Sequence, residues 1–101
     1  MEKRAMKRME AKAEVLLQPG SGGYMVSGYT KNISPIGLFA EVDERFPIGT
    51  KMLVVIRHPT SGQTAAVEGR VVHVQADGMG IAYKPLSARS NEQLQKVLST
   101  L

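Results

Sequence analysis

The sequence predicts an all-β domain closed by one helix, on three observations. Six short apolar segments are separated by connections that contain Gly or Pro, at the close spacing of a small antiparallel barrel. The second segment alternates with a period of two residues, as a half-buried strand does. The last dozen residues instead carry apolar side chains on one helical face: Leu94, Val97, Leu98 and Leu101. We therefore expect a six-stranded antiparallel β-barrel with a C-terminal helix.

The expected strands follow the apolar segments in chain order. They are Ala13–Gln18, Tyr24–Lys31, Leu38–Val42, Met52–Ile56, Thr64–Val74 and Met79–Tyr83. The Pro-Gly-Ser-Gly-Gly run after the first segment favours a hairpin. We expect Gly49 to supply an unusual backbone angle in its connection, and Gly69 to mark a bulge or a bend.

The start of the helix has its own signal. Ser90 stands three residues before Gln93, which matches a capping box and predicts a helix with Ser90 as its cap. We expect the apolar stripe that follows to pack across the mouth of the barrel rather than to bind a partner.

The bulk properties indicate one small domain that binds an anion. The chain has 101 residues, no Cys and a net charge of +4, of which Met1–Lys12 contribute +3. No apolar run is long enough to span a bilayer, and Met1 leads directly into charged residues. We therefore expect a cytoplasmic protein that does not bind a membrane.

A polar segment interrupts two apolar runs within Thr30–Glu41. Asn32 and Ser34 can hold a turn through bonds to nearby backbone amides, and Pro35 fixes its own φ. Gly37 tolerates positive φ, or lets a ligand or a second chain segment approach bare backbone. On residue chemistry alone this is a well-made turn between two strands. The basic terminus alone could equally be a solvated segment without a function.

Together the two segments form a pattern. Arg4-Ala5-Met6-Lys7-Arg8 is an Arg-x-x-x-Arg pair, and about two dozen residues later Asn32–Gly37 reads Asn-x-Ser-x-x-Gly. This order and separation resemble the two-part signature of the PilZ domain family, known as a receptor for the bacterial second messenger cyclic di-GMP. The resemblance covers nearly the whole chain, since Val67–Val72 and Gly78–Tyr83 look like the family's last strands. It implies a flexible basic arm over residues 1–12 and a PilZ-like barrel with its helix over residues 13–101.

The resemblance implies five ligand-binding residues: Arg4, Arg8, Asn32, Ser34 and Gly37. Arginine suits the ligand because its planar fork pairs with phosphate or with a guanine edge and its flat face stacks on a purine. An amide oxygen and a hydroxyl can accept the guanine N–H groups, while glycine keeps the surface open for a base. Many members of the family have Asp at the Asn position, and an amide is the weaker acceptor.

The resemblance implies a protein that binds cyclic di-GMP and signals to a partner protein through ordering of its arm. An alternative is a PilZ-like adaptor that binds no nucleotide and acts through protein contacts, for instance in pilus or motility machinery. A third reading is a small basic barrel for single-stranded nucleic acid. Its aromatic residues are two Phe and three Tyr, without an interleaved basic stripe, so we expect no nucleic acid polymer as partner.

Catalytic and metal-binding patterns are not present in the sequence. His58 and His73 are the two histidines, no Cys accompanies them, and His73 reads as a strand residue. The serines lie in turns and caps without a nucleophile elbow, and Gly20–Gly23 lacks the Lys-Ser/Thr of a phosphate-binding loop. We therefore expect no enzyme activity, no metal and no cofactor besides the ligand.

Overall fold

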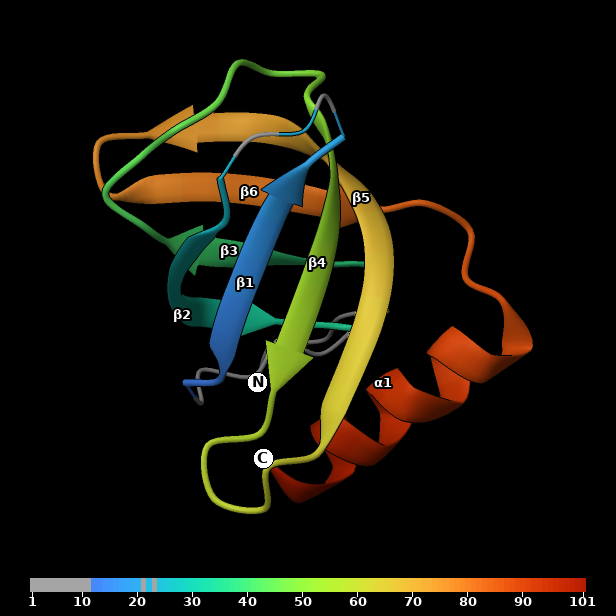
Figure 1. Cartoon of the computed structure of the whole chain (residues 1–101). Helices are drawn as coiled ribbons and strands as arrows, with labels where there is room; N and C mark the ends of the chain where they lie inside the picture. The colour runs from blue at the N-terminus through green and yellow to red at the C-terminus, as the bar shows by residue number, and fades with distance from the viewer. Residues whose placement is uncertain (1–11, 21, 23) are drawn as a thin grey trace, which may run out of the picture.

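The computed structural model describes residues 12–20, 22 and 24–101, which form six strands and one helix (Figure 1). In chain order these are β1 (Glu14–Pro19), β2 (Val26–Ile33), β3 (Gly37–Glu41), β4 (Lys51–Arg57), β5 (Thr64–Gln75), β6 (Gly78–Tyr83) and α1 (Ala88–Thr100). Of the expected arm, the description includes Lys12 alone. No helix in the described part of the chain has both the length and the hydrophobicity to cross a lipid bilayer.

The strands join into one closed antiparallel barrel. Hydrogen-bonded neighbours follow the order β1, β2, β3, β6, β5 and β4, and β4 pairs back with β1. The predicted fold class is confirmed, and each predicted strand is present with its ends within two residues of the predicted ones. The predicted first hairpin is confirmed as well, because β1 pairs antiparallel with β2.

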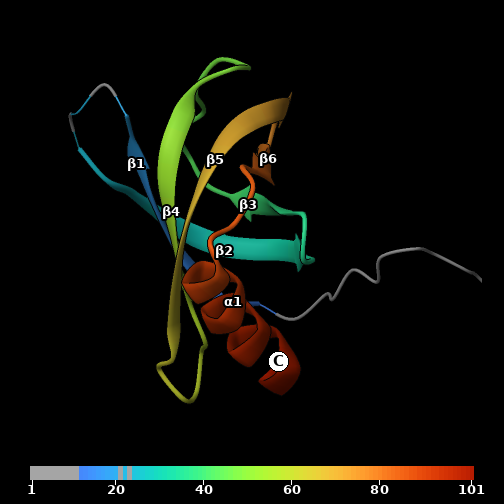
Figure 2. The ribbon, with the colours of Figure 1, turned by 90° about the vertical axis from the view of Figure 1, so that its right-hand side faces the viewer.

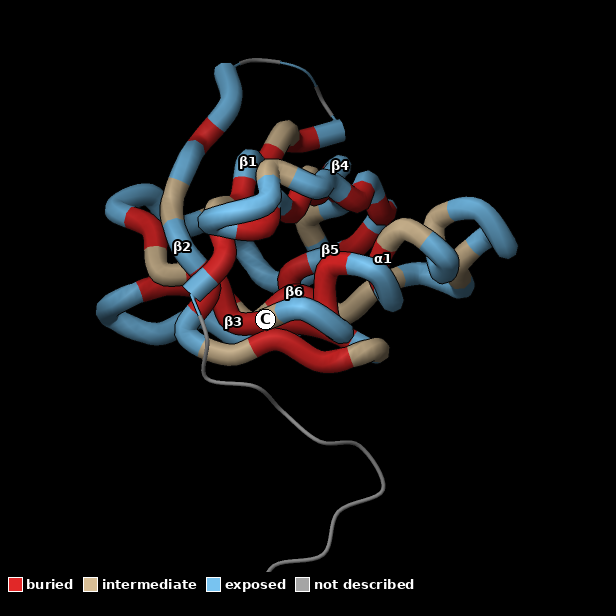
Figure 3. Tube along the Cα trace, turned by 90° about the horizontal axis from the view of Figure 1, so that it is seen from below, coloured by how far each residue is buried: buried red, intermediate tan, exposed pale blue. Residues whose placement is uncertain are grey.

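Alternating side chains fill the barrel. In β4, Met52, Val54 and Ile56 are buried while Lys51 and Arg57 at its ends are exposed. β1 and the first eight residues of β5 also place buried residues at every second position, whereas β3 is buried over four consecutive residues (Figure 3). Burying an aliphatic side chain of this size stabilises the fold by about 1.5–3 kcal/mol. The alternation therefore determines which face of each strand turns inward.

The apolar stripe of α1 packs into the barrel core, as predicted. Leu94, Val97 and Leu98 are buried and belong to the same core as the strand residues, with Leu101 partly buried against it. Figures 1 and 2 show the helix at one end of the barrel, beside β4 and β5. The helix thus covers the end that the strands leave open.

The predicted start of this helix is wrong. Ser87 is the cap, and its hydroxyl accepts a hydrogen bond from the Ser90 N–H at 3.1 Å. The two residues of the expected capping box bond to β5 instead. Ser90 Oγ donates to the carbonyl of Ala66 at 3.0 Å, and Gln93 Oε1 accepts from the Ala66 N–H at 3.4 Å. Because β6 does not pair with this part of β5, these side chains satisfy backbone groups that strand pairing leaves open.

Two glycines test the expected backbone features. Gly49 has a φ of +95°, as predicted for its connection. Gly69 carries no bulge: it pairs in register with Tyr83, and the register shift between β5 and β6 lies further along, between Val71 and His73. A Cβ atom at Gly69 would lie 2.8 Å from the carbonyl oxygen of Ala82. Glycine is needed at this position because β6 approaches closely.

His58 fastens the end of α1 to the β4–β5 hairpin. The residue is buried, and its Nδ1 lies 3.1 Å from the backbone nitrogens of Thr60 and Ser61. Because two backbone N–H donors point at Nδ1, this atom accepts and the ring proton sits on Nε2. Nε2 then donates to the carbonyl oxygen of Thr100 at 2.9 Å. One imidazole ring therefore closes the hairpin and holds the last turn of the helix.

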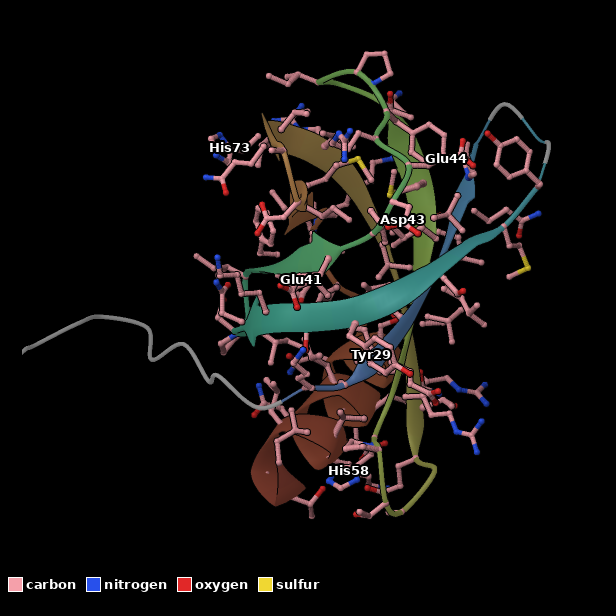
Figure 4. The ribbon with its side chains drawn as sticks, turned by 90° about the vertical axis from the view of Figure 1, so that its left-hand side faces the viewer. Tyr29, Glu41, Asp43, Glu44, His58 and His73 are labelled. Carbon is pink, nitrogen blue, oxygen red and sulfur yellow. The ribbon has the colours of Figure 1, made fainter. Side chains whose placement is uncertain are left out.

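We predict that His58→Ala lowers the free energy of unfolding by about 2–3 kcal/mol, because it removes the bond to Thr100 and leaves two N–H donors unpaired. His73 is the matched control, since it is exposed on β5 at the other end of the barrel (Figure 4). His73→Ala should change this free energy by less than about 0.5 kcal/mol. Urea denaturation followed by circular dichroism measures the free energy of unfolding of both variants. Equal losses in the two would contradict this role of His58.

The Tyr83 hydroxyl is buried and has no hydrogen-bond partner among the described residues. Burial raises the pKa of Tyr83 above its ordinary value of 10.0, because a low-dielectric site disfavours the phenolate. The folded protein thus holds this proton more tightly than the unfolded chain does.

Tyr83 therefore makes stability depend on pH on the alkaline side. Its contribution is complete below pH 10.0 and is lost as the pH rises above that value, where the unfolded chain releases the proton first. We predict that Tyr83→Phe removes this loss and, at neutral pH, is neutral or stabilising by up to about 1 kcal/mol. Urea denaturation of both proteins from neutral to strongly alkaline pH is the measurement. An identical alkaline decline in the two would count against the assignment.

Candidate functional site

Three of the five candidate residues lie together where β2 turns into β3. We call this segment, Asn32–Gly37, the β2–β3 corner. Figure 2 shows it at the edge of the barrel that lies opposite β1 and β4. The two other candidates, Arg4 and Arg8, lie outside the described residues.

A bulge near the end of β2 decides which way Asn32 faces. The register between β2 and β3 shifts between Thr30 and Asn32, so Lys31 is an extra residue. This residue reverses the alternation, because Thr30 and Ile33 are both fully buried. Asn32 is half-buried and pairs with Phe39, which lies outside the core cluster. The bulge therefore places Asn32 on the outer side of the barrel.

The Ser34 side chain holds the turn. It is 1% exposed, and its hydroxyl donates to the Gly37 carbonyl at 3.1 Å and accepts from the Ile36 N–H at 3.2 Å. The Ser34 N–H also donates to the Gly37 carbonyl, at 2.9 Å. This bonding fixes the shape of the corner, so the geometry gives Ser34 a positioning role.

Gly37 allows β6 to approach the corner. Its φ is not positive, and a Cβ atom there would lie 2.5 Å from the carbonyl oxygen of Ile81. Of the roles expected for this glycine, the close approach of a second chain segment is the one that the structure contains. The Tyr83 N–H donates to the Ile36 carbonyl at 3.0 Å, which ties β6 to the corner itself.

The described chain begins beside this corner. Thr30 holds Ala13 through two hydrogen bonds of 2.9 Å, one from the Ala13 N–H to Thr30 Oγ1 and one from the Thr30 N–H to the Ala13 carbonyl. Lys12 Nζ lies 3.5 Å from Glu41 Oε1. Glu14 pairs with Tyr29, so each step back along the chain moves toward the end of β2 that carries the corner (Figure 4). Sequence reasoning missed these contacts, because nothing local in the sequence indicates them.

The charges around the corner are mixed. Lys31 Nζ lies 3.5 Å from Asp77 Oδ2 and 5.8 Å from the centre of the Phe39 ring. This places a cation on the outer surface next to Asn32. In residues 12–20, 22 and 24–101, no group of three His, Cys, Asp or Glu side chains is arranged to hold a metal ion.

Comparison with known proteins places this geometry in context. The sequence model of the PilZ domain matches residues 2–99. Among curated protein sequences, none matches significantly.

Solved structures share the fold at low sequence identity. The PilZ domain of CeSA from a cellulose-synthesizing bacterium has a TM-score of 0.74 at 15% identity, covering 93% of this chain and 97% of that one. The PilZ domain of YcgR from Escherichia coli with c-di-GMP has a TM-score of 0.76 at 11% identity, covering 99% and 92%. The Bacillus subtilis inhibitor of motility (MotI/DgrA) gives 0.73 at 19%, covering 99% of this chain, which spans 51% of that protein. At these identities the matches show a common fold.

We predict that Gly37→Ala destabilises the barrel by about 1–3 kcal/mol even without a ligand, because its Cβ would collide with the β6 backbone. Gly20→Ala is the matched control, since a Cβ at Gly20 would lie 3.4 Å from its nearest neighbour, the Lys51 carbonyl oxygen. Urea denaturation should show a loss in the first variant and less than about 1 kcal/mol in the second. A Gly37→Ala variant as stable as the parent would refute this reading of the corner.

Proposed function

Because the chain belongs to the PilZ domain family, known as receptors for cyclic di-GMP, we propose that it binds this nucleotide at the β2–β3 corner and signals to a partner protein. One observation carries the proposal. The chain that follows the arginine pair enters the barrel beside β2, at the end that bears Asn32. The YcgR structure of the same fold contains c-di-GMP, which supports the ligand class.

Chain length supports a meeting of the arm and the corner. Arg8 precedes Lys12 by four residues, which span at most about 14 Å when extended. Ala13 is bonded to Thr30, two residues before Asn32. The guanidinium of Arg8 is therefore within reach of a ligand at the corner without any change in the barrel.

The residues take complementary roles in this proposal. Arg4 and Arg8 pair with phosphate or guanine edges and stack on the purines. Asn32 accepts a guanine N–H from the outer side of β2. Ser34 and Gly37 contribute by holding the turn and by seating it against β6.

The signal in this proposal comes from ordering of the arm. Glu2–Lys12 consists of good helix formers without a firm apolar stripe, and such a short helix is marginal in water. Closing the arm over nucleotide costs ordering entropy, which the arginine contacts offset. The closed arm then creates or hides a surface that a partner protein recognises.

We predict that Arg8→Ala weakens cyclic di-GMP binding at least tenfold, because the bidentate and stacking contacts of a guanidinium are lost. Lys7→Ala removes the same charge from the neighbouring position and should weaken binding less than threefold. Isothermal titration calorimetry of the wild type and both variants gives affinity and stoichiometry. Equal affinities for wild type and Arg8→Ala would rule out the proposed binding role of Arg8. A wild type that does not bind cyclic di-GMP would favour the alternative, an adaptor that binds no nucleotide.

The same samples test the ordering step. Nuclear magnetic resonance relaxation of residues Lys3 to Met9 should show slower internal motion once nucleotide is added. Equal rigidity with and without nucleotide would contradict ordering while leaving the binding result intact.

A further inference from the structure

The outer side of β1, β4 and β5 faces the viewer in Figure 1, where no other strand or helix lies in front of it. It carries exposed apolar side chains. Leu16 is 39% exposed and Leu53 is 40% exposed. The register places Leu16 opposite Val55, and Val55 opposite Ala66, so these side chains are contiguous. The buried stripe of α1 belongs to the core, on the inner side of the same strands. We call this outer surface the β1–β4–β5 face.

Hollows indent this face. A hollow of about 490 Å³ is lined by Leu16, Tyr29 and Val55 among others. Two further hollows, of about 410 and 380 Å³, are both lined by Leu53 and Glu68. Large contiguous apolar patches that polar residues surround often mark interaction sites. Hollows along this face suit side-chain anchors, and two of them share Leu53 and Glu68 in their walls.

Strand addition does not explain this face. The barrel is closed, so β1 and β4 each have a strand on both sides. Where β6 stops short of β5, Ser90 and Gln93 bond to the Ala66 backbone. With these edges occupied, a partner engages the face through side chains, as an amphipathic helix does in an apolar groove.

The charges at the rim are unbalanced at one end. Arg57 Nε lies 3.8 Å from Glu14 Oε1, and Lys84 Nζ lies 3.8 Å from Glu68 Oε1. Beyond Leu53, however, Lys51 stands directly opposite Arg70.

Two like charges in a cross-strand pair repel. No carboxylate of residues 12–20, 22 or 24–101 forms an ion pair with Lys51 or Arg70. An occupant that places carboxylates there would relieve this repulsion. A second copy of the chain fits less well, because a symmetric contact would present the same basic surplus to itself.

We propose that the β1–β4–β5 face docks an amphipathic helix of a partner protein. The apolar stripe of that helix covers Leu16, Leu53 and Val55, and carboxylates at one end lie over Lys51 and Arg70. The face is turned away from the β2–β3 corner, as Figure 2 shows, so docking leaves the corner free. This proposal stands independently of nucleotide binding.

A displayed library of 20-residue helical peptides with randomised surface positions tests the proposal. Selection uses immobilised wild-type protein, with counter-selection on Leu16→Gln/Leu53→Gln, whose changes lie on the exposed surface and are checked for folding by circular dichroism. We expect enriched peptides to combine an apolar stripe at i, i+3, i+4 and i+7 with Asp or Glu at one end. Failure to enrich discriminating peptides, or enrichment of peptides without this pattern, would overturn the proposal.

Titration of one enriched peptide then tests the geometry. Lys51→Ala/Arg70→Ala should weaken binding about tenfold at low salt, and Leu16→Gln/Leu53→Gln at least tenfold. Ile48→Gln is the control, because Ile48 is an exposed apolar residue in the connection before β4 and its change should leave affinity within about twofold. Equal weakening by the control would refute the site. Sedimentation that shows a wild-type dimer, made monomeric by Leu16→Gln/Leu53→Gln, would refute it by identifying a second copy as the occupant.

Discussion

The close approach of β3 and β6 is the constraint on which the barrel depends. A Cβ at Gly37 would collide with the Ile81 carbonyl, and one at Gly78 with the Ala40 carbonyl. Side chains at these positions would force the two strands apart and open the ring. Because β3 begins at Gly37, the contact that closes the barrel also fixes the position of the β2–β3 corner.

The shape of the corner follows from hydrogen bonds within the chain. The Ser34 hydroxyl closes the turn, the extra residue in β2 turns Asn32 outward, and Thr30 binds the incoming chain at Ala13. A site built in this way needs little rearrangement on binding, so most of the ordering cost of the proposed mechanism falls on the arm. In this proposal the arm's arginines would contribute to affinity and determine how much of the chain responds to ligand.

The fold could be predicted because its signals are local. The continuous apolar run that predicts β4 and the apolar stripe of α1 depend on neighbouring residues, and both the strand and the helix are confirmed. The wrong predictions concern choices between distant partners. Ser90 matches a cap in sequence, yet Ser87 is the cap and Ser90 bonds to a strand 24 residues earlier. In the same way, the bulge in β2 and the contact of Gly37 with β6 depend on cross-strand register, which no short motif specifies.

The closed ring limits how a signal could pass between the two proposed surfaces. Each strand hydrogen-bonds to two neighbours, and β1 carries both the chain that enters beside the corner and Leu16 of the β1–β4–β5 face. Deforming β1 would break pairs with β2 and β4 together, which is costly in a packed barrel. A nucleotide at the corner is therefore expected to act by moving the arm relative to a rigid barrel. In such a mechanism the β1–β4–β5 face keeps one shape. A docked helix would stay in place, while the position of the arm would determine which surface that helix contacts.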